Sequence, residues 1–305
     1  MISMNFSWLD DFRALADSGN FSRAAEERHM TQPAFSRRIR ALEEWLGTDL
    51  FDRSSQPARL TPAGVWFQGV AQDLTSRALR IPGEARAVAD AHATTLRFAA
   101  THALSFTFMP GWLRGLETRH SVGPISLVSD VLARCESQLL QGDVQFVLCH
   151  AHPLSTSELQ THSYPCARVG TDVLVPVSAP DAEGKPRHSL FGEAGETPAH
   201  VLSYSAESGL GRILREVHGA ALDRHLAQSV FTAHLASVLR TMALDGRGLA
   251  WLPRTLVAED LQQGRLLEAA PPEGFIELEV RLYRDRGPLG TAAEDFWQAV
   301  LASDQ

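Results

Sequence analysis

The chain has 305 residues, of which 44% are hydrophobic and 21% charged, and its formal net charge is −8. This composition is typical of a globular chain of two or three domains, and its acidic balance argues against an architectural protein that coats DNA. With three cysteines and no long apolar run, a disulfide framework and a membrane span are not expected. Residues 1–20 lack the basic-then-apolar pattern of an export signal, so we expect a cytoplasmic protein.

The first predicted elements are three helices, from Trp8 to Ser18, from Ser22 to His29 and from Thr31 to Gly47. Apolar residues at spacings of three and four support the first helix. Ser22 and Thr31 are expected to act as N-caps, and Gly47 is a typical residue for ending a helix. Two short helices joined by a tight turn, with a third before them, indicate a helix-turn-helix domain.

The third helix has two different faces. On a helical wheel its apolar residues form one stripe, made of Phe35, Ile39, Leu42 and Leu46. Its polar face carries Pro33, Ser36, Arg37 and Arg40, with Gln32 and Arg38 at the edges. Arginine can bind a guanine edge with two hydrogen bonds, and Gln and Ser can reach other base edges. A solvated surface is the alternative reading of such a face, but its place after two short helices favours DNA recognition.

A small hairpin is predicted after the third helix. Residues 52–58 are rich in turn-forming residues, and Arg59-Leu60-Thr61 is the expected return strand. Such a hairpin is the wing of a winged helix-turn-helix, and Arg53 and Arg59 can enter a narrow minor groove from it. Residues 1–95 hold 11 Arg against 12 Asp or Glu, so DNA affinity must come from where the arginines lie rather than from bulk charge.

A long helix is expected to begin at Pro62, with Thr61 as its cap. Phe67, Val70, Leu74 and Ile81 form a stripe along it that could pair with a partner helix. Pro82-Gly83 predicts a kink or a premature end.

From Thr94 onward, short apolar runs alternate with helical segments. The first series has strands at TLRFAA, ISLVSD and VQFVLC, and helices at residues 106–120 and 132–141. The second has strands at DVLVPVS, HVLSYS, QSVFTA and GLAWLP, with helices after Ser208 and at residues 235–243. EVRLYR and a helix from Ala292 are expected to return to the first lobe. This order predicts two α/β lobes with a mostly parallel sheet and a cleft for a small ligand.

Ligands of such sheets bind at the carboxyl ends of the strands. This rule selects eight effector-binding candidates: Thr101, His102, Ser105, Ser129, Asp130, Ser203, Tyr204 and Ser205. Gly246 and Gly248, near the crossing between the lobes, are two further candidates. Ser105 has the alternative role of a helix N-cap, and His102 that of a structural histidine.

The sequence CHAHP, residues 149–153, raises two further alternatives. Cys149, His150 and His152 are metal-ligand types, but adjacent ligands without a second cluster make a poor site, so we expect no metal. Cys149 and Cys166 could form a redox pair or could be small buried hydrophobic residues. No G-x-S-x-G, H-E-x-x-H, Walker or dinucleotide motif is found, so neither an enzyme nor a cofactor is expected.

The segment from Phe21 to Gly64, FSRAAEERHMTQPAFSRRIRALEEWLGTDLFDRSSQPARLTPAG, resembles the N-terminal signature of the LysR-type transcriptional regulators. The resemblance implies a winged helix-turn-helix at 1–61, a dimerising linker helix at 62–93 and a two-lobed, periplasmic-binding-protein-like effector domain at 94–305, with its second lobe at about 168–267. The family's DNA-contacting positions fall on Gln32, Pro33, Ser36, Arg37 and Arg53, and Ser22 is expected to meet a phosphate. We add Arg38, Arg40 and Arg59 as candidates.

The family resemblance implies a homodimer or homotetramer on double-stranded DNA, with RNA polymerase as a further candidate partner. NFSRAA, TQPAFSRRIRALE and MALDGRGLAWLP are also similar to the hypochlorite-responsive subgroup, which would place the protein in a stress response. Met109 and Met242 are the only methionines of the effector domain, which leaves a sensor based on methionine oxidation little to work with. We therefore expect a DNA-binding regulator that senses a small molecule or an oxidant. The alternatives are regulation through Cys or Met oxidation, and a cytosolic binding protein or enzyme of the two-lobed fold.

Overall fold

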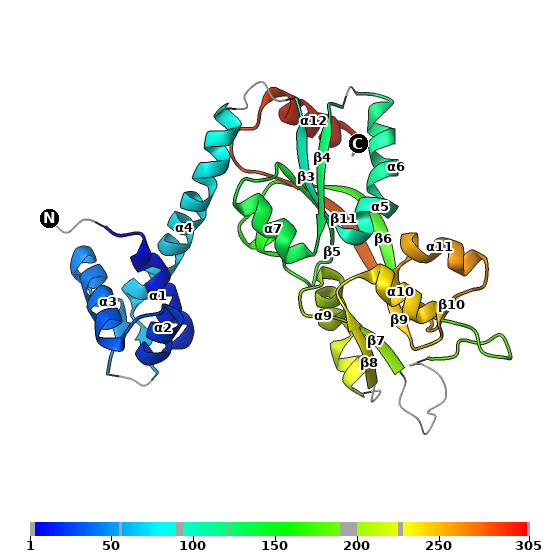
Figure 1. The fold of residues 1–305 in the computed structure, drawn as a ribbon, viewed down its shortest axis with the longest axis horizontal. Helices are drawn as coiled ribbons and strands as arrows, with labels where there is room; N and C mark the ends of the chain where they lie inside the picture. The colour runs from blue at the N-terminus through cyan, green and yellow to red at the C-terminus, as the bar shows by residue number, and fades with distance from the viewer. Residues whose placement is uncertain are drawn as a thin grey trace. The chain divides into compact units, whose positions relative to one another are not determined.

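The computed structural model describes residues 4–54, 57–89, 94–120, 122–189, 200–224 and 228–303. The chain divides into two compact units, Met1–Ile81 and Pro82–Gln305, each with hydrophobic cores of its own (Figure 1). No helix in the described ranges combines the length and apolarity that crossing a membrane requires.

The N-terminal unit is the predicted winged helix-turn-helix. Its elements are α1 (Ser7–Ser18), α2 (Phe21–Glu27), α3 (Gln32–Leu46), β1 (Phe51–Asp52), β2 (Arg59–Leu60) and the start of α4 (Pro62–Ala89). β1 and β2 pair antiparallel, as the hairpin prediction requires. The tip of the hairpin, at residues 55–56, lies outside the described residues. The N-cap of α2 is Asn20 rather than Ser22, because its side chain accepts hydrogen bonds from the backbone N–H groups of Ser22 and Arg23.

The core of this unit uses the apolar stripe of α3 as predicted. Phe35, Ile39 and Leu42 are fully buried, and Leu46 packs against the same core at partial exposure. Phe12 of α1 lies edge-on to Phe67 of α4, with 5.0 Å between the ring centroids. These contacts fix the polar face of α3 toward solvent.

The stripe along α4 is divided between two environments, which corrects our prediction of one continuous partner surface. Phe67, Val70 and Leu74 pack into the core of the N-terminal unit itself, whereas Ile81 is 56% exposed. Among the α4 residues whose burial is described, the large apolar side chains that are exposed are Val65, Trp66, Leu79 and Ile81.

The predicted premature end at Pro82 is wrong, because α4 continues to Ala89 with Pro82 inside it. A proline removes only its own N–H bond to the carbonyl four residues earlier, and the neighbouring hydrogen bonds can hold the helix together. The boundary between the two compact units nevertheless falls at Ile81/Pro82. The expected end of the linker, at residues 90–93, lies outside the described residues.

The C-terminal unit is built on one seven-stranded sheet and a smaller two-stranded one. The strands are β3 (Leu96–Thr101), β4 (Ile125–Asp130), β5 (Phe146–Ala151), β6 (Cys166–Ser178), β7 (His200–Tyr204), β8 (Gln228–Ala233), β9 (Ala250–Pro253), β10 (Leu267–Glu268) and β11 (Ile276–Arg284). The large sheet has the order β10-β6-β11-β5-β3-β4, with β9 also paired to β6. β7 and β8 form the small sheet.

The large sheet is not mostly parallel, which corrects the prediction. Among the described strands of this sheet, only β3–β4 and β3–β5 pair in parallel, while β11 runs antiparallel between β5 and β6. The return of EVRLYR to the first lobe is confirmed by the pairing of β11 with β5. The long strands β6 and β11 therefore connect the two lobes.

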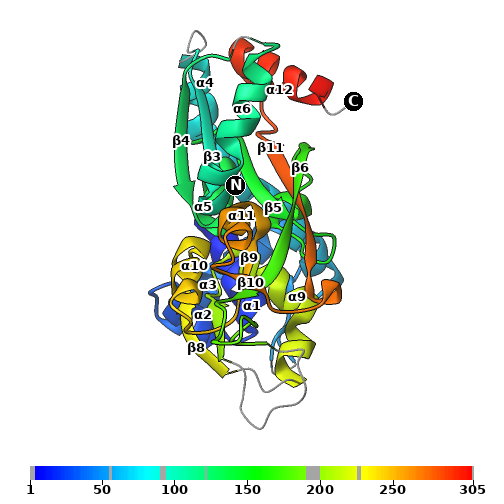
Figure 2. The same ribbon diagram turned by 90° about the vertical axis from the view of Figure 1, so that its right-hand side faces the viewer.

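Helices cover both faces of the first lobe's sheet (Figures 1 and 2). α6 (Met109–Glu117) and α12 (Thr291–Ser303) pack on one face around Phe98 and Phe146, and α7 (Leu132–Leu140) and α8 (Glu158–Thr161) pack on the other. The predicted helix at 106–120 is two helices, α5 (His102–Thr107) and α6, because Pro110 lacks the N–H that a continuous helix would use.

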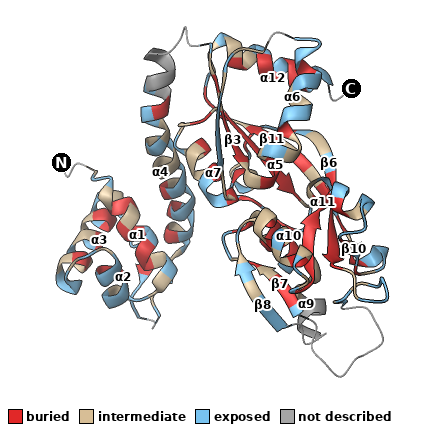
Figure 3. Cartoon of the chain, turned by 45° about the vertical axis from the view of Figure 1, so that its right-hand side comes forward, coloured by how far each residue is buried: buried red, intermediate tan, exposed pale blue. Residues whose placement is uncertain are grey.

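The second lobe contains α9 (Gly209–Arg224), α10 (Ala236–Leu244) and α11 (Arg254–Gln262), followed by a 3-10 turn at Pro272–Gly274. These helices pack around a hydrophobic core that includes the buried residues Leu239 and Trp251. Figure 3 shows the contrast between the buried central strands and the exposed edge strand β4. α8, α11 and β10 were not predicted from the sequence.

Candidate functional site

The outer face of α3 presents the predicted base-reading residues to solvent. Gln32, Pro33, Arg37 and Arg40 are exposed, and Ser36 is half-buried. Within the part of the chain that the structure describes, neither Arg37 nor Arg40 takes part in an ion pair. Both guanidinium groups therefore have their donors available for a polyanion.

Arg38 has a different role from its two neighbours. Its Nε lies 2.7 Å from Oδ2 of Asp11, a fully buried carboxylate on α1, and its guanidinium also hydrogen-bonds Ser7. Arg28, the C-cap residue of α2, pairs with the same carboxylate at 3.0 Å. The Asp11 carboxylate thus joins the three helices, and Arg38 has a structural ion pair that Arg37 and Arg40 lack among the described residues.

Glu43 connects the end of α3 to the wing. Its buried carboxylate accepts hydrogen bonds from the backbone N–H groups of Leu50 (2.9 Å) and Phe51 (3.2 Å). Its second oxygen lies 2.5 Å from the Arg53 guanidinium, which also sits over the ring of Phe21. Glu43 therefore determines where the wing and Arg53 lie relative to the recognition helix.

A cleft runs between α3, the start of α2 and the wing. It is lined by predicted DNA-contacting residues from three elements: Ser22, Gln32, Ser36 and Arg53. Arg59 lies on the wing strand opposite Asp52. The structure thus brings a set of residues that is scattered along the sequence onto one concave surface.

Replacing Glu43 by Gln should loosen the wing. The amide still accepts from the backbone N–H groups but loses the charge that holds Arg53, which we expect to cost about 1 kcal/mol because the arginine is a third exposed. Glu44→Gln, on the exposed side of the same turn, is the matched control. Hydrogen exchange of the wing amides measures the difference, and equal exchange in the two variants would contradict this role.

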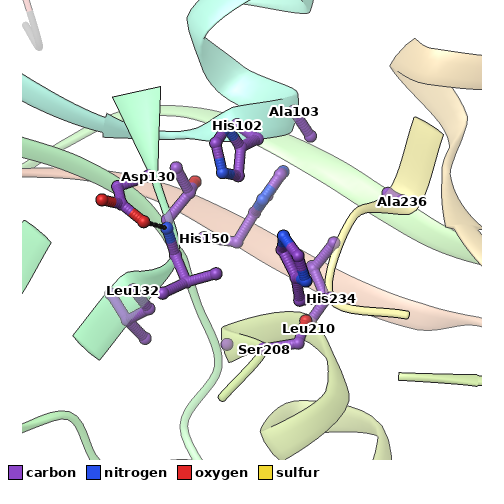
Figure 4. A pocket seen from close by; sticks show the side chains of 12 residues that line it. His102, Ala103, Asp130, Leu132, His150, Ser208, Leu210, His234 and Ala236 are labelled. Atoms are coloured by element: carbon purple, nitrogen blue, oxygen red, sulfur yellow. Dashed lines mark hydrogen bonds between the residues drawn. The ribbon is translucent and has the colours of Figure 1, made fainter. Parts of the chain in front are cut away.

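In the C-terminal unit, the ends of several strands surround one small cavity of about 40 Å³. Figure 4 shows the side chains around it, among them three histidines from both lobes. The lining residues are Thr101, His102, Ala103, Asp130, Val131, Leu132, His150, Ser208, Gly209, Leu210, His234 and Ala236. Three of the predicted effector-binding residues, Thr101, His102 and Asp130, therefore meet here.

A short hydrogen-bond network adjoins the cavity. His102 Nδ1 lies 3.0 Å from Ser129 Oγ, and Ser105 Oγ lies 2.9 Å from that same hydroxyl. Ser105 is not an N-cap, because Thr101 occupies that position of α5. Burial lowers the pKa of His102, against an opposing effect of Asp130, and His234 lowers it further.

His150 links the cavity to the joint between the lobes. It is 6% exposed, and its Nε2 lies 3.4 Å from Asp172 Oδ2 on β6. Asp172 also accepts hydrogen bonds from the Thr255 hydroxyl (2.6 Å) and backbone N–H (3.2 Å) in α11. Burial alone would raise the pKa of Asp172, but the donors of His150 and Thr255 outweigh it and lower that pKa.

The other predicted effector residues lie outside the cavity lining. The Tyr204 hydroxyl donates to the Trp251 carbonyl inside the core, and Ser203 accepts from Ser229. Ser205 accepts the Ser208 N–H through its carbonyl. Gly246 takes a φ of 71° in a turn beside Arg187, and Gly248 packs against the His200 carbonyl. The structure therefore does not bring these five residues together with Thr101, His102 and Asp130 at the cavity.

The sequence analysis missed His150, Ser208 and His234. His234 follows the end of β8 directly, so the strand-end rule that selected His102 would also have selected it. His150 lies inside β5 and was considered only as a metal ligand. Its position at the cavity depends on the pairing of β5 between β3 and β11.

The proposed redox pair is not supported by the geometry. Cys149 on β5 and Cys166 on β6 both pair with β11, opposite Arg281 and Tyr283. Two strand spacings amount to about 10 Å, beyond the roughly 7 Å that a disulfide can span between Cα atoms. Cys149 is also buried, which raises the pKa of its thiol.

Among the residues that the structure describes, no group of three His, Cys, Asp or Glu side chains is arranged to hold a metal ion. Within CHAHP, His150 faces the cavity, whereas His152 Nδ1 accepts a hydrogen bond from the Leu154 N–H.

Two family models match the chain. The bacterial regulatory helix-turn-helix protein of the lysR family matches residues 6–65, and the LysR substrate binding domain matches residues 89–305. Together they span both units.

Individual proteins are similar over nearly the whole chain. The HTH-type transcriptional regulator YjiE of Escherichia coli is 29% identical over 296 residues, covering 96% of this chain and 93% of that protein. Full-length HypT from Salmonella typhimurium, described as a hypochlorite-specific LysR-type transcriptional regulator, is 28% identical with a TM-score of 0.58, covering 100% of this chain and 99% of that chain. Vibrio fischeri DarR, solved in complex with DNA, is 28% identical with a TM-score of 0.55 and covers 98% of each chain.

Proposed function

This chain belongs to the LysR family of DNA-binding transcriptional regulators, and we propose that its effector domain senses a small molecule or an oxidant and thereby changes how an oligomer binds its operator. The observation that carries the proposal is the combination of a winged helix-turn-helix with a two-lobed unit that contains a small cavity at the ends of its strands, lined by three histidines among other residues. The first can read DNA, and the second can change state when the cavity is filled.

For the DNA-binding part, we assign base reading to the exposed residues of α3: Gln32, Pro33, Ser36, Arg37 and Arg40. Arg53 and Arg59 serve the adjacent minor groove, and Ser22 meets a phosphate. The cleft that joins Ser22, Gln32, Ser36 and Arg53 supports this assignment.

We propose a homodimer or homotetramer that works in the cytoplasm, with RNA polymerase as a further partner. The exposed Val65, Trp66, Leu79 and Ile81 give α4 apolar surface for a partner helix. A dimer would present two recognition helices to an inverted repeat. The similar DarR, which was solved in complex with DNA, supports the DNA-binding part of this proposal.

For the signal, reversible occupation of the cavity is favoured over oxidation of the protein itself. Met109 is 2% exposed and Met242 packs partly buried against the second lobe's core, so neither offers a readily oxidised thioether. The similarity to the hypochlorite-specific HypT supports an oxidant or a related small species as the signal. An enzyme of the two-lobed fold is disfavoured because the similar proteins are transcriptional regulators.

The test is selection of DNA from a random pool by the full-length protein, followed by fluorescence anisotropy at several salt concentrations. We expect the selected sequence to bind at least about 10³-fold more tightly than random DNA. Weak binding of random DNA should follow from the near-neutral charge of residues 1–95. Equal affinity for selected and random DNA would contradict a sequence-specific regulator.

A further inference from the structure

The wing is attached to the rest of the N-terminal unit at a second place besides Glu43. Its strand ladder ends at the pair Asp52–Arg59. The next residue toward the tip, Ala58, donates its N–H to the carbonyl of Gly19 at 2.9 Å. Gly19 lies in the turn between α1 and α2, so this bond ties the return strand of the wing to the first two helices.

Gly19 is a rigid point of attachment. It is the C-cap of α1, where it takes a left-handed φ of 60° and donates its N–H to the Leu15 carbonyl at 2.8 Å. Leu15 is fully buried, and the residue after Gly19, Asn20, is the N-cap of α2. Both helices therefore fix the carbonyl that accepts the Ala58 N–H.

The contact between Gly19 and the wing leaves no room for a side chain. A Cβ atom on Gly19 would lie 2.8 Å from Pro57 Cβ and 3.3 Å from the Ala58 carbonyl oxygen. Both of these neighbours belong to the wing, and Pro57 is exposed. Because two helices fix the turn, a side chain at residue 19 would displace the wing rather than the helices.

The two arginines of the wing differ in what holds their side chains. Arg53 is held by the protein itself, through its ion pair with Glu43. Arg59 is exposed and, within the described ranges, forms no ion pair. Its partner across the hairpin is Asp52, whose pKa is lowered chiefly by hydrogen bonds from Ser54 and only to a smaller extent by the charge of Arg59. The Arg59 guanidinium therefore has donors available for DNA.

The Gly19 turn and the wing border the same cleft as the recognition helix. Ser18, Gly19 and Asn20 line it from the turn, and Pro57 and Ala58 line it from the wing. An arginine that enters a narrow minor groove favours A·T-rich sequence through the width and negative potential of that groove. The distance between the wing and α3 decides where along the DNA such an arginine meets the groove.

We propose that Gly19 is a positioning residue for DNA recognition. By holding Ala58, it places the Arg59 guanidinium at the minor groove beside the base pairs that α3 reads, so that the protein prefers A·T pairs at this flank. The inference rests on the proposed function, because it assumes that the wing meets DNA next to α3.

The test compares the DNA selected by the full-length protein with the same DNA in which 2,6-diaminopurine replaces adenine at the flanking positions. This base adds an amino group in the minor groove and leaves the major-groove edge unchanged. We expect A·T pairs at the flanks of the selected DNA. The modified DNA should bind about tenfold more weakly, which lies within the range for one base-contacting arginine. Anisotropy at one fixed salt concentration measures both affinities.

Gly19→Ala should reduce this flank preference to less than about twofold, while base changes at the positions that α3 reads keep their full effect. Gly47→Ala is the matched control. Gly47 also ends a helix with a left-handed φ, of 75°, but a Cβ there meets no atom within 4 Å. The control bears a similar backbone strain without touching the wing, and it should keep the flank preference.

Ala58→Pro provides a second variant should Gly19→Ala fail to fold. It removes the N–H that Gly19 accepts and leaves α1, α2 and their turn unchanged. It should reduce the flank preference as Gly19→Ala does. Urea denaturation of each variant reports whether the N-terminal unit is folded under the binding conditions.

A double-mutant cycle separates positioning from a general loss of structure. Arg59→Ala should abolish the flank preference, and adding Gly19→Ala to it should cause no further loss. A flank preference retained in folded Gly19→Ala, in Ala58→Pro or in Arg59→Ala would overturn the inference, and so would an equal loss in Gly47→Ala.

The unaltered protein distinguishes this inference from the proposed function. Discrimination at the positions that α3 reads, without a flank preference, would overturn only the role of Gly19. Equal affinity for selected and random DNA would instead contradict a sequence-specific regulator.

Discussion

Gly64→Ala should destabilise the N-terminal unit by about 3 kcal/mol, at the upper end of the cost of overpacking a well-packed site. A Cβ atom on Gly64 would lie 2.1 Å from the Leu50 carbonyl oxygen and 3.0 Å from Leu60 Cδ2. The Leu50 oxygen cannot move freely, because it accepts the Thr61 N–H at 2.9 Å and belongs to the segment that leads into β1. The start of α4 would therefore separate from the wing.

Gly69→Ala is the matched control, one and a half turns further along α4. A Cβ there meets no atom within 4 Å, so the gain in helix propensity should stabilise the helix by up to about 1 kcal/mol. Hydrogen exchange of peptides from residues 4–54 and 57–81 measures both changes in the full-length chain. Exchange in Gly64→Ala as slow as in the unaltered protein would show that the wing can yield to the added methyl group.

The helices and the hairpin of the N-terminal unit could be predicted closely, because residues close together in the sequence determine them. The stripe of Phe35, Ile39 and Leu42 sets the buried face of α3, and Gly47 takes the left-handed conformation that ends it. The error at the N-cap of α2 also arises between residues close together in the sequence. Asn20 and Ser22 are both good caps, and only the backbone path shows that Asn20 receives the two N–H groups.

The C-terminal unit was predicted in its elements but less well in their pairing. Periodicity identifies β6 and β11 as strands, but it does not reveal that they run antiparallel across both lobes. The strand-end rule found Thr101, His102 and Asp130 because β3 and β4 are parallel neighbours. The same rule would also have selected His150, which directly follows the predicted strand VQFVLC, but that residue was considered only as a metal ligand.

The helical wheel has a comparable limit. It places side chains around one helix but does not show which residues of other elements they contact. The wheel places Arg37 and Arg40 on the polar face and Arg38 at its edge, and it does not show what Arg38 contacts. In the fold, Arg38 forms an ion pair with the buried carboxylate of Asp11 on α1. Arg38 therefore contributes to the folding of the domain, whereas we assign Arg37 and Arg40 to DNA binding.

This division makes Arg37→Ala and Arg38→Ala a decisive pair. Arg37→Ala should lower the affinity for the selected DNA by about 1–3 kcal/mol, the range for a base-reading arginine, and relax discrimination at one position of each half-site. Its stability should be unchanged, because the side chain is exposed and forms no ion pair among the described residues. Anisotropy with single-base variants of the selected DNA measures the discrimination.

Arg38→Ala should have the opposite profile, with a loss of about 2 kcal/mol in the stability of the N-terminal unit. Removing one partner of a buried carboxylate can cost 3–5 kcal/mol, but Arg28 still pairs with Asp11 and the Arg38 side chain is 31% exposed. Urea denaturation measures the stability, and binding at saturating protein measures discrimination by the folded fraction. If Arg38→Ala kept full stability and lost discrimination, the ion pair with Asp11 would yield to DNA in the complex, and Arg38 would join Arg37 as a reader of bases.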